Sequence, residues 1–321
     1  MTQPAPAFRC DMHTHTIRSD GNDSPRELID NAAALGLHAI GLTDHDIDPP
    51  RTIADDAGRE VHPAAYALRR GIVLIPGYEF SCDTYVDDCH ICGYALDWDH
   101  PDLQAEVQAA KRSKSQAYEE LCQVLTARGM PVDWEADVLT VRDAQGNVKG
   151  RRDPDEVQRK HVFEAMAARG HCKTWSEAKI LVRDDPELNV PRRKIDPLAA
   201  IELIHRCGGI AVLAHPHLID EEVRPNRGAA ITRAAYIERL LAAGLDGIEA
   251  RYTYDKTSYK GTQTPEQIEA EVRTAYAGRV NFVSGGSDYH ADHKKGTQPA
   301  RRLGERGLSV EEFEQAFAQL L

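Results

Sequence analysis

The stretch Phe8–Gly21, "FRCDMHTHTIRSDG", joins a short apolar segment to two histidines that are one residue apart. An aspartate, Asp20, follows five residues after the second histidine. Side chains point to alternate sides of an extended segment, so His13 and His15 face the same way. Neutral imidazole nitrogens and carboxylate oxygens are ligands for divalent zinc, manganese and iron. The stretch therefore predicts a strand that ends in a metal-binding loop.

Apolar segments of this kind alternate with amphipathic segments along much of the chain. Ser24 precedes Pro25 and stands three residues before Glu27, which is a capping-box pattern and predicts a helix over residues 24–35. Two further helices are predicted over 196–207 and 231–243. Alternating strands and helices are typical of a largely parallel sheet, either open or closed into a barrel. The predicted strands are Ala7–Met12, His38–Thr43, Ile72–Pro76, Cys89–Ala95, Ile210–Ala214, Gly247–Arg251 and Val280–Ser284.

The middle of the chain has a different pattern. From residue 101 to residue 194 the strand signals fade, and helical patterns dominate at 102–128 and 155–169. The connections there, such as "VRDAQGNVKGRRDPDE", are rich in basic residues. We therefore predict an α/β part formed by residues 1–100 and 195–321, and a helical insertion at 101–194. We expect the insertion to cover the site as a cap and to exclude water.

The composition excludes several classes of protein. The formal net charge is -12, which argues against a broad nucleic-acid surface and against a stable nucleic-acid partner. No apolar run is long enough for a membrane span, and "MTQPAPAF" lacks the pattern of a secretory signal, so we expect a cytoplasmic protein with no membrane partner. The seven cysteines are expected to be reduced apolar fillers. Cys89 and Cys92 form a single CxxC with no second pair, which is weak evidence for structural zinc.

Ionisable side chains gather at the predicted strand ends. The carboxyl ends of parallel strands meet on one face of the sheet, so residues far apart in sequence would meet there in space. Their number exceeds what one tetrahedral ion can use, which indicates a site for several metals. Closely spaced metals suit phosphoryl displacement. The residues are His13, His15, Asp20, His45, Glu79, His90, His215, Asp288 and His290.

Each residue alone has an ordinary structural interpretation. A lone HxH pair is as often incidental as it is metal-binding, and His90 alone would more often be a hydrogen-bonded interior histidine. Asp20 alone, before a glycine, is a good turn residue. We expect Asp44 and Asp46 to support His45 rather than to bind metal. The coincidence of such residues at six strand ends is what favours a metal site.

Six motifs together resemble the PHP (polymerase and histidinol phosphatase) family of metal-dependent phosphoesterases: "DMHTHTIRSDG", "GLTDHD", "PGYEFS", "HICGY", "LAHPH" and "GGSDYH". The resemblance implies a distorted (β/α)7 barrel, three divalent ions (Mn2+, Fe2+ or Zn2+) and hydrolysis of phosphate esters. Asp20 stands where the family often has a histidine, although small-molecule phosphatases of the family also use a carboxylate. The resemblance implies three ligand groups: His13, His15, Glu79 and Asp288; Asp20, His45 and His290; and Glu79, His90 and His215.

The mechanism that follows from this resemblance needs no protein nucleophile. A hydroxide that bridges two metals would attack phosphorus in line. Glu79 and Asp288 are the catalytic candidates among the ligands. The departing alkoxide needs a proton, and His217 is the candidate donor on the protein.

The substrate is predicted from basic residues, since a phosphorylated substrate needs a second grip on its non-reacting phosphate. The spacing of Arg159 and His161 resembles an Arg-x-His of the family's nucleotide-bisphosphate phosphatases. We expect a small phosphorylated ribose or nucleotide, such as 5-phosphoribosyl 1,2-cyclic phosphate or a 3′,5′-nucleotide bisphosphate. A phosphomonoesterase of the histidinol-phosphate type is the alternative. The candidate phosphate-binding residues are Arg18, Arg159, His161, Arg251 and Lys256.

Three other classes of function remain as alternatives. PHP modules also accompany polymerases, so a DNA-editing nuclease is one, although the net charge opposes a duplex-binding face. An amidohydrolase acting on a C–N bond would use similar ligands in a barrel. A metal-storing or regulatory protein is the third, and the full set of competent ligands argues against it.

Overall fold

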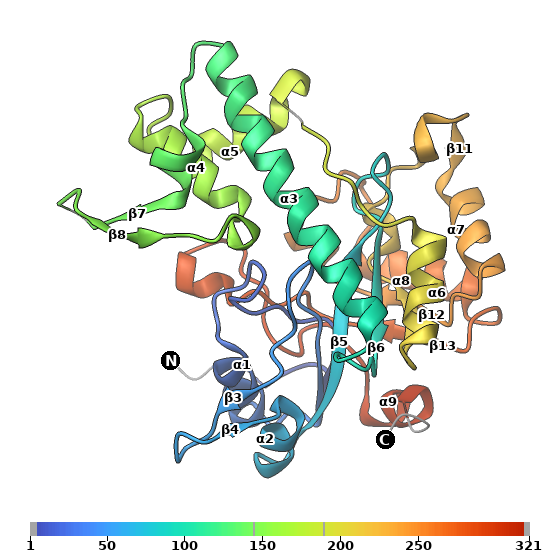
Figure 1. Ribbon diagram of the computed structural model, residues 1–321. Coiled ribbons are helices and arrows are strands. Elements are labelled where there is room, and N and C mark those ends of the chain that lie inside the picture. The colour runs from blue at the N-terminus through green and yellow to red at the C-terminus, as the bar shows by residue number, and fades with distance from the viewer. Residues whose placement is uncertain (1–4, 144, 189, 318–321) are drawn as a thin grey trace. The chain divides into compact units, whose positions relative to one another are not determined.

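Seven strands form the central sheet in the order β1-β2-β5-β6-β9-β12-β13 (Figure 1). The computed structural model describes residues 5–143, 145–188 and 190–317. Each of the seven predicted strands corresponds to one strand of this sheet. Their bounds are β1 Cys10–Asp11, β2 Ala39–Leu42, β5 Val73–Ser81, β6 His90–Tyr94, β9 Ile210–Leu213, β12 Gly247–Arg251 and β13 Phe282–Gly285.

The sheet curls until its two edge strands approach each other. Beyond β1, the amide of Met12 donates to the carbonyl of Gly285 at 3.2 Å, and the amide of His15 donates to the carbonyl of Tyr289 at 2.8 Å. Helices surround the sheet (Figure 1). The distorted seven-stranded barrel that the sequence predicts is confirmed.

Strand β6 departs from the parallel arrangement. It runs antiparallel to both β5 and β9, whereas the other neighbouring strands of the barrel are parallel. Only residues 82–89 separate β5 from β6. A connection that short suits an antiparallel pair, because a parallel pair needs a crossover of a dozen or more residues. The first residue of β6 therefore lies at the edge of the barrel where the parallel strands end.

The helices of the barrel part begin with the caps that their sequences indicate. At α1, the Glu27 amide donates to the Ser24 hydroxyl at 3.2 Å, and the Ser24 amide donates to the Glu27 carboxylate at 2.7 Å. The predicted capping box is therefore present. The helices are α1 Pro25–Ala34, α2 Pro63–Arg69, α6 Pro197–Arg206, α7 Arg233–Ala242, α8 Pro265–Tyr276 and α9 Val310–Phe317.

Short elements complete the barrel part. Two antiparallel pairs join β3 (Ile53–Ala54) to β4 (Glu60–Val61) and β10 (Glu222–Val223) to β11 (Ile231–Thr232). Single helical turns follow three of the barrel strands. They are η4 (Pro216–Leu218) and η5 (Pro225–Arg227) after β9, η6 (Tyr254–Lys256) after β12, and η7 (Asp292–Lys295) after β13.

The chain divides into two compact units. The barrel unit consists of residues 1–107 and 195–321, and the insertion unit consists of residues 108–194. Helix α3 (Pro101–Ala127) begins in the first and continues into the second. Each unit has its own apolar core, built in the barrel unit around Tyr78, Ile204 and Ile248 and in the insertion unit around Leu125, Val162 and Met166.

The insertion unit is mostly helical but also contains a hairpin, which the sequence analysis did not predict. Besides α3 it contains α4 (Arg159–Ala168), α5 (Trp175–Asp184) and the short helices η1 (Trp134–Leu139), η2 (Pro154–Glu156) and η3 (Pro186–Leu188). Strands β7 (Thr140–Arg142) and β8 (Val148–Arg151) pair antiparallel. Val148 in β8 is 61% exposed, so the hairpin lacks the buried alternate residues that usually reveal a strand in a sequence. Among the described residues, no helix has the length and apolar character to span a membrane.

Candidate metal centre

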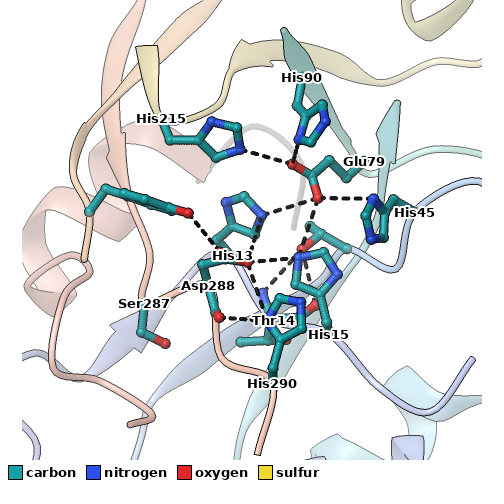
Figure 2. A network of polar contacts seen from close by, with 12 residues as sticks. His13, Thr14, His15, His45, Glu79, His90, His215, Ser287, Asp288 and His290 are labelled. Carbon is teal, nitrogen blue, oxygen red and sulfur yellow. Dashed lines mark hydrogen bonds and ion pairs between the residues drawn. The ribbon is translucent and has the colours of Figure 1, made fainter. Parts of the chain in front are cut away.

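The predicted ligands meet at one edge of the barrel (Figure 2). His13 and His15 follow β1, His45 follows β2 and His215 follows β9. Asp288 and His290 follow β13 in the same manner. The parallel strands end there, which explains how one barrel collects side chains from distant parts of the sequence.

Two ligands reach this edge in a way that corrects the sequence-based expectation. Glu79 was expected just beyond its strand, but β5 continues to Ser81 because it pairs with β6 along its whole final half. Glu79 is therefore inside the strand. His90 was expected inside or near its strand and is the first residue of β6, at the amino end of that strand rather than at a carboxyl end. The antiparallel direction of β6 brings it to the same edge.

Glu79 lies at the centre of the cluster, and its two oxygens face different partners. Oε2 lies 3.4 Å from Nε2 of His13 and 3.3 Å from Nε2 of His15. Oε1 lies 2.9 Å from Nδ1 of His90 and 3.2 Å from Nε2 of His215. The carboxylate thus has the placement of a group that bridges two ions.

Two aspartates complete the cluster. Oδ1 of Asp288 lies 3.0 Å from Nε2 of His15 and 3.6 Å from Nε2 of His13. Oδ1 of Asp20 lies 2.9 Å from Nε2 of His290 and 3.2 Å from Nε2 of His45. All nine predicted ligands are therefore within one connected set of contacts.

The donor atoms fit divalent metal ions. Four groups of three donors have ligand atoms within 4.8 Å of one another. Nε2 of His13, Nε2 of His15 and Nδ1 of His45 are buried without a hydrogen-bond partner among the described residues. Buried polar atoms normally have a hydrogen-bond partner. These nitrogens are therefore suited to donate their lone pairs to a metal ion. The four groups are His13, Glu79 and His215; His13, His15 and Asp288; His15, His45 and Glu79; and His15, Asp20 and His290.

The electrostatics of the cluster keep Glu79, Asp288 and His15 in their metal-binding forms. Burial opposes ionisation of Glu79, but the neighbouring imidazoles of His13 and His90 outweigh it and hold its pKa well below the usual value. The pKa of Asp288 is likewise well below its usual value, because His290 and Arg301 outweigh the effect of burial. Burial lowers the pKa of His15 to about 4. At neutral pH both carboxylates are therefore charged and His15 is neutral.

Asp288 is held by two residues that the sequence analysis did not single out. The Tyr252 hydroxyl donates to Oδ2 of Asp288 at 2.6 Å, and the Arg301 guanidinium donates to the same oxygen at 2.7 Å. Arg301 also donates two hydrogen bonds to Asp292, from Nε to Oδ2 at 2.8 Å and from Nη2 to Oδ1 at 3.1 Å. With Oδ2 occupied, Oδ1 is the oxygen that remains for a metal. Neither Tyr252 nor Arg301 lies in a motif with a recognisable spacing.

Further carboxylates orient the loops and rings of the cluster. Asp44 accepts hydrogen bonds from the Thr16 amide at 2.7 Å and from the Ser19 hydroxyl at 2.6 Å, which agrees with the supporting role expected for it. Asp46 accepts from the Ser81 hydroxyl at 2.6 Å.

Asp11 and Glu249 are two more supporting carboxylates, and the sequence analysis missed both. Asp11 accepts from the Ser287 amide at 2.9 Å and so fixes the start of the loop that contains Asp288. Glu249 accepts from the His215 amide at 2.8 Å and lies 3.4 Å from Nδ1 of His13. A charged residue in the middle of an otherwise apolar strand, "GIEAR", was the available signal for Glu249.

Three residues that were predicted to bind phosphate or to donate a proton have charged partners within the protein. Arg251 forms ion pairs with Glu269 at 2.7 Å and Glu312 at 2.6 Å, and Lys256 pairs with Glu305, so carboxylates already occupy both cations. These ion pairs join elements of the barrel unit, and a role of Arg251 and Lys256 toward phosphate stays a prediction.

The third of these residues is His217, the candidate proton donor. Burial lowers the pKa of His217 to about 4, and its role as a proton donor stays a prediction. Its Nε2 faces Glu271 at 3.6 Å.

The other predicted phosphate-binding residues lie elsewhere or are held locally. The guanidinium of Arg18 donates to the carbonyl of Asp48 at 2.9 Å, in the barrel unit. Arg159 and His161 belong to α4 of the insertion unit, where Nδ1 of His161 accepts from the Gln158 amide at 3.0 Å. Their role toward a substrate stays a prediction.

A cavity of about 400 Å3 lies in the barrel unit and contains none of the cluster residues. Charged residues in its lining include Lys256, Arg302 and Glu305. The ion pair between Lys256 and Glu305 already satisfies part of this lining.

A seven-stranded barrel with a convergent His, Asp and Glu cluster at one edge defines a metal-dependent hydrolase. The PHP domain family matches residues 11–149 of the chain. The "5'-3' exoribonuclease Rnm" of Salmonella typhimurium is 31% identical over 284 residues, which cover 87% of this chain and 84% of that protein. The chain belongs to the PHP family, and it is a metal-dependent phosphoric ester hydrolase. The resemblance predicted from the motifs is confirmed.

Other relatives extend this comparison. The "3',5'-nucleoside bisphosphate phosphatase" of Chromobacterium violaceum is 27% identical over 292 residues, which cover 89% of this chain and 88% of that protein. A solved structure of a metal-dependent phosphoesterase from Bifidobacterium adolescentis shares the fold with a TM-score of 0.66, at 24% identity and with 98% of each chain covered. A Chromobacterium violaceum structure described as an amidohydrolase with bound sulfate has a TM-score of 0.62 and 25% identity, with 88% of this chain and 87% of that chain covered.

Proposed function

We propose that this enzyme hydrolyses a phosphate ester on the ribose of a nucleotide, with three divalent ions per chain. The observation that carries the proposal is the placement of Glu79, whose two oxygens face separate sets of imidazoles. Two relatives support a nucleotide as the substrate, because one is named as a nucleoside bisphosphate phosphatase and the other as an exoribonuclease.

Three ligand sets account for all nine donors. Divalent ions bound there would lower the pKa of water and neutralise charge on the phosphate oxygens, and Mn2+, Fe2+ and Zn2+ all suit mixed imidazole and carboxylate donors. Glu79 is shared by two of the sets. The sets are His13, His15, Glu79 and Asp288; Asp20, His45 and His290; and Glu79, His90 and His215.

The chain's own residues contribute position and access. The side chains of His13 and His15 are 1% exposed, whereas that of Asp20 is 53% exposed and that of His45 is 24% exposed. The substrate therefore approaches from the side of Asp20 and His45, and the buried pair lies behind it. Tyr252 and Arg301 fix the rotation of Asp288 so that it presents a single oxygen to the cluster.

A 3′,5′-nucleotide bisphosphate is the substrate that we favour. The relative named for it matches almost nine tenths of both chains. A second candidate is the 5′ end of an RNA strand, which the 31% identical relative supports. The net charge of -12 favours a small substrate, because a long strand requires clustered positive charge.

The two remaining phosphoester candidates are the cyclic ester and the histidinol-phosphate type. A relative from Eggerthella lenta named "Phosphoribosyl 1,2-cyclic phosphate 1,2-diphosphodiesterase" is 24% identical over 291 residues and supports the former. All four candidates share one chemistry, in which water attacks phosphorus and an alcohol departs.

A hydrolysis screen in which the products of each substrate are separated and quantified by chromatography tests the proposal. The purified enzyme with added Mn2+ would be offered adenosine 3′,5′-bisphosphate, a 5′-phosphorylated oligoribonucleotide, 5-phosphoribosyl 1,2-cyclic phosphate, histidinol phosphate and an amide. We expect the largest kcat/KM for the bisphosphate, with Glu79→Gln as the inactive control. Hydrolysis of the amide without turnover of any phosphoester would contradict the proposal, and so would full activity of Glu79→Gln.

A further inference from the structure

An exposed aromatic ring and an arginine stack on two loops of the barrel unit. Tyr85 lies in the β5–β6 loop (residues 82–89), and Arg227 is the last residue of η5. The guanidinium carbon of Arg227 lies 4.8 Å from the centroid of the Tyr85 ring. Tyr85 remains 43% exposed. Within the described part of the chain, no carboxylate pairs with Arg227, so its charge is available to a ligand.

Both loops leave the edge of the barrel where the metal ligands meet. Ser81 pairs with His90 across the hairpin, so the β5–β6 loop joins the strand of Glu79 to His90 itself. Tyr85 is four residues beyond Ser81, which places it at most about 14 Å away even if the chain is fully extended. The loop that carries the ring therefore joins two strands that both contain ligands of the cluster.

The β5–β6 loop is held in place, so the ring is already positioned before a ligand binds. Asp83 accepts hydrogen bonds from the Tyr85 amide at 2.9 Å and from the Tyr236 hydroxyl at 3.0 Å. The next residue, Val86, is only 1% exposed and anchors the loop in the core. A surface that is ordered in advance binds with a smaller loss of conformational entropy.

The arginine side of the stack is held in an unusual backbone conformation. Asn226 and Arg227 have φ values of 52° and 56°, in the left-handed region. Residues with a side chain adopt this region rarely. The backbone thus directs Arg227 onto the ring, although the same arginine could otherwise extend into solvent.

We propose that Tyr85 and Arg227 form a subsite for the base of a nucleotide. The base stacks on the exposed part of the Tyr85 ring, and Arg227 adds its charge to the binding of the attached phosphate. Aromatic stacking accepts any of the four bases, because each has a π-face. The inference rests on the proposed function and deepens it, since it selects nucleotides over ribose phosphates that lack a base.

A pair of substrates that differ only in the base tests the proposal. Adenosine 3′,5′-bisphosphate and its abasic counterpart, 1-deoxyribose 3,5-bisphosphate, would be compared by kcat/KM. We expect the wild-type enzyme to prefer the nucleotide about tenfold, which is within the range for stacking of one base. Tyr85→Ala should lose that preference through a slower reaction of the nucleotide alone, and Tyr85→Phe should keep it. Equal losses on both substrates, or an unchanged preference in Tyr85→Ala, would overturn the proposal.

Two further measurements separate this proposal from the proposed function. Arg224 lies three residues before Arg227 and pairs with Glu222. Arg224→Ala is therefore the control for loss of an arginine near the subsite, and it should keep the preference for the nucleotide over the abasic substrate. Equilibrium binding of AMP and of ribose 5-phosphate reports the same preference without turnover. If no phosphoester is hydrolysed but Tyr85→Ala weakens AMP binding about tenfold and leaves ribose 5-phosphate unaffected, the subsite stands and the proposed reaction fails. Equal binding of AMP by wild type and Tyr85→Ala would overturn the subsite in either case.

Discussion

Replacing Tyr252 by phenylalanine tests how the metal centre is positioned. The change removes one hydroxyl and leaves every charge in place. Within the described structure, the only side-chain hydrogen bond of the Tyr252 hydroxyl is the 2.6 Å bond to Oδ2 of Asp288. A hydrogen bond to a charged group contributes about 1.5–3 kcal/mol, which corresponds to between tenfold and about a hundredfold in an equilibrium constant. Because Arg301 still holds the same oxygen at 2.7 Å, we expect the lower end, about a tenfold loss of affinity for one ion.

Manganese binding measured by electron paramagnetic resonance, with a competing chelator, would report this loss without any need for turnover. Tyr66→Phe is the matched control, because the Tyr66 hydroxyl donates to Asp30 at 2.9 Å outside the cluster. Both variants remove a hydrogen bond to a carboxylate and should lower the free energy of unfolding, by about 1.5–3 kcal/mol. Unchanged manganese affinity in Tyr252→Phe, or an equal loss in Tyr66→Phe, would refute the positioning role.

Three other predictions follow from the structure. Glu79→Gln should lower the rate of phosphate release at least a thousandfold while the melting temperature changes little, since it removes the shared carboxylate charge from the cluster; phosphate assays and calorimetry would check both parts. In the metal-free protein the charge of Asp20 outweighs burial and raises the pKa of His45 to about 9. The ion pair between His45 and Asp20 therefore stabilises the fold fully below about pH 6.5 and is lost as the pH rises through 9. The melting temperature should fall over that range in the wild type and should fall less in His45→Asn. Ser24→Ala should lower the free energy of unfolding by about 1 kcal/mol, through loss of the α1 cap, with kcat unchanged; a change in kcat would show that α1 affects the cluster.

The sequence predicted the strands and helices of the α/β part because its local signals agree with the tertiary structure, whereas closure into a barrel was implied by the resemblance to the PHP family. Apolar strands of four or five residues, such as Ile210–Leu213, are buried, and the capping box at Ser24 forms as its spacing indicates. The direction of β6 was not predicted, because strand signals carry no direction. The short connection over residues 82–89 was the observation from which the antiparallel direction could have been inferred.

The candidate ligands could be found in the sequence, whereas the residues that support them could not. Histidines and acids beside strand ends form a visible pattern, and Figure 2 shows the labelled members of that pattern together. Tyr252 and Arg301 are separated from Asp288 by 36 and 13 residues, and only the closed barrel brings them to one oxygen. For Arg251 and Lys256 the sequence does not show that Glu312 and Glu305 pair with them, because these partners are far away along the chain.

The central claim is that nine donors from distant parts of the chain bind a shared group of metal ions. Anomalous diffraction from crystals of the manganese-loaded enzyme tests it most directly. We predict three peaks, with Glu79 contacting two of them and Asp288 contacting one, at distances of about 2.0–2.3 Å. Manganese peaks elsewhere, with none in contact with Glu79, would contradict the claim.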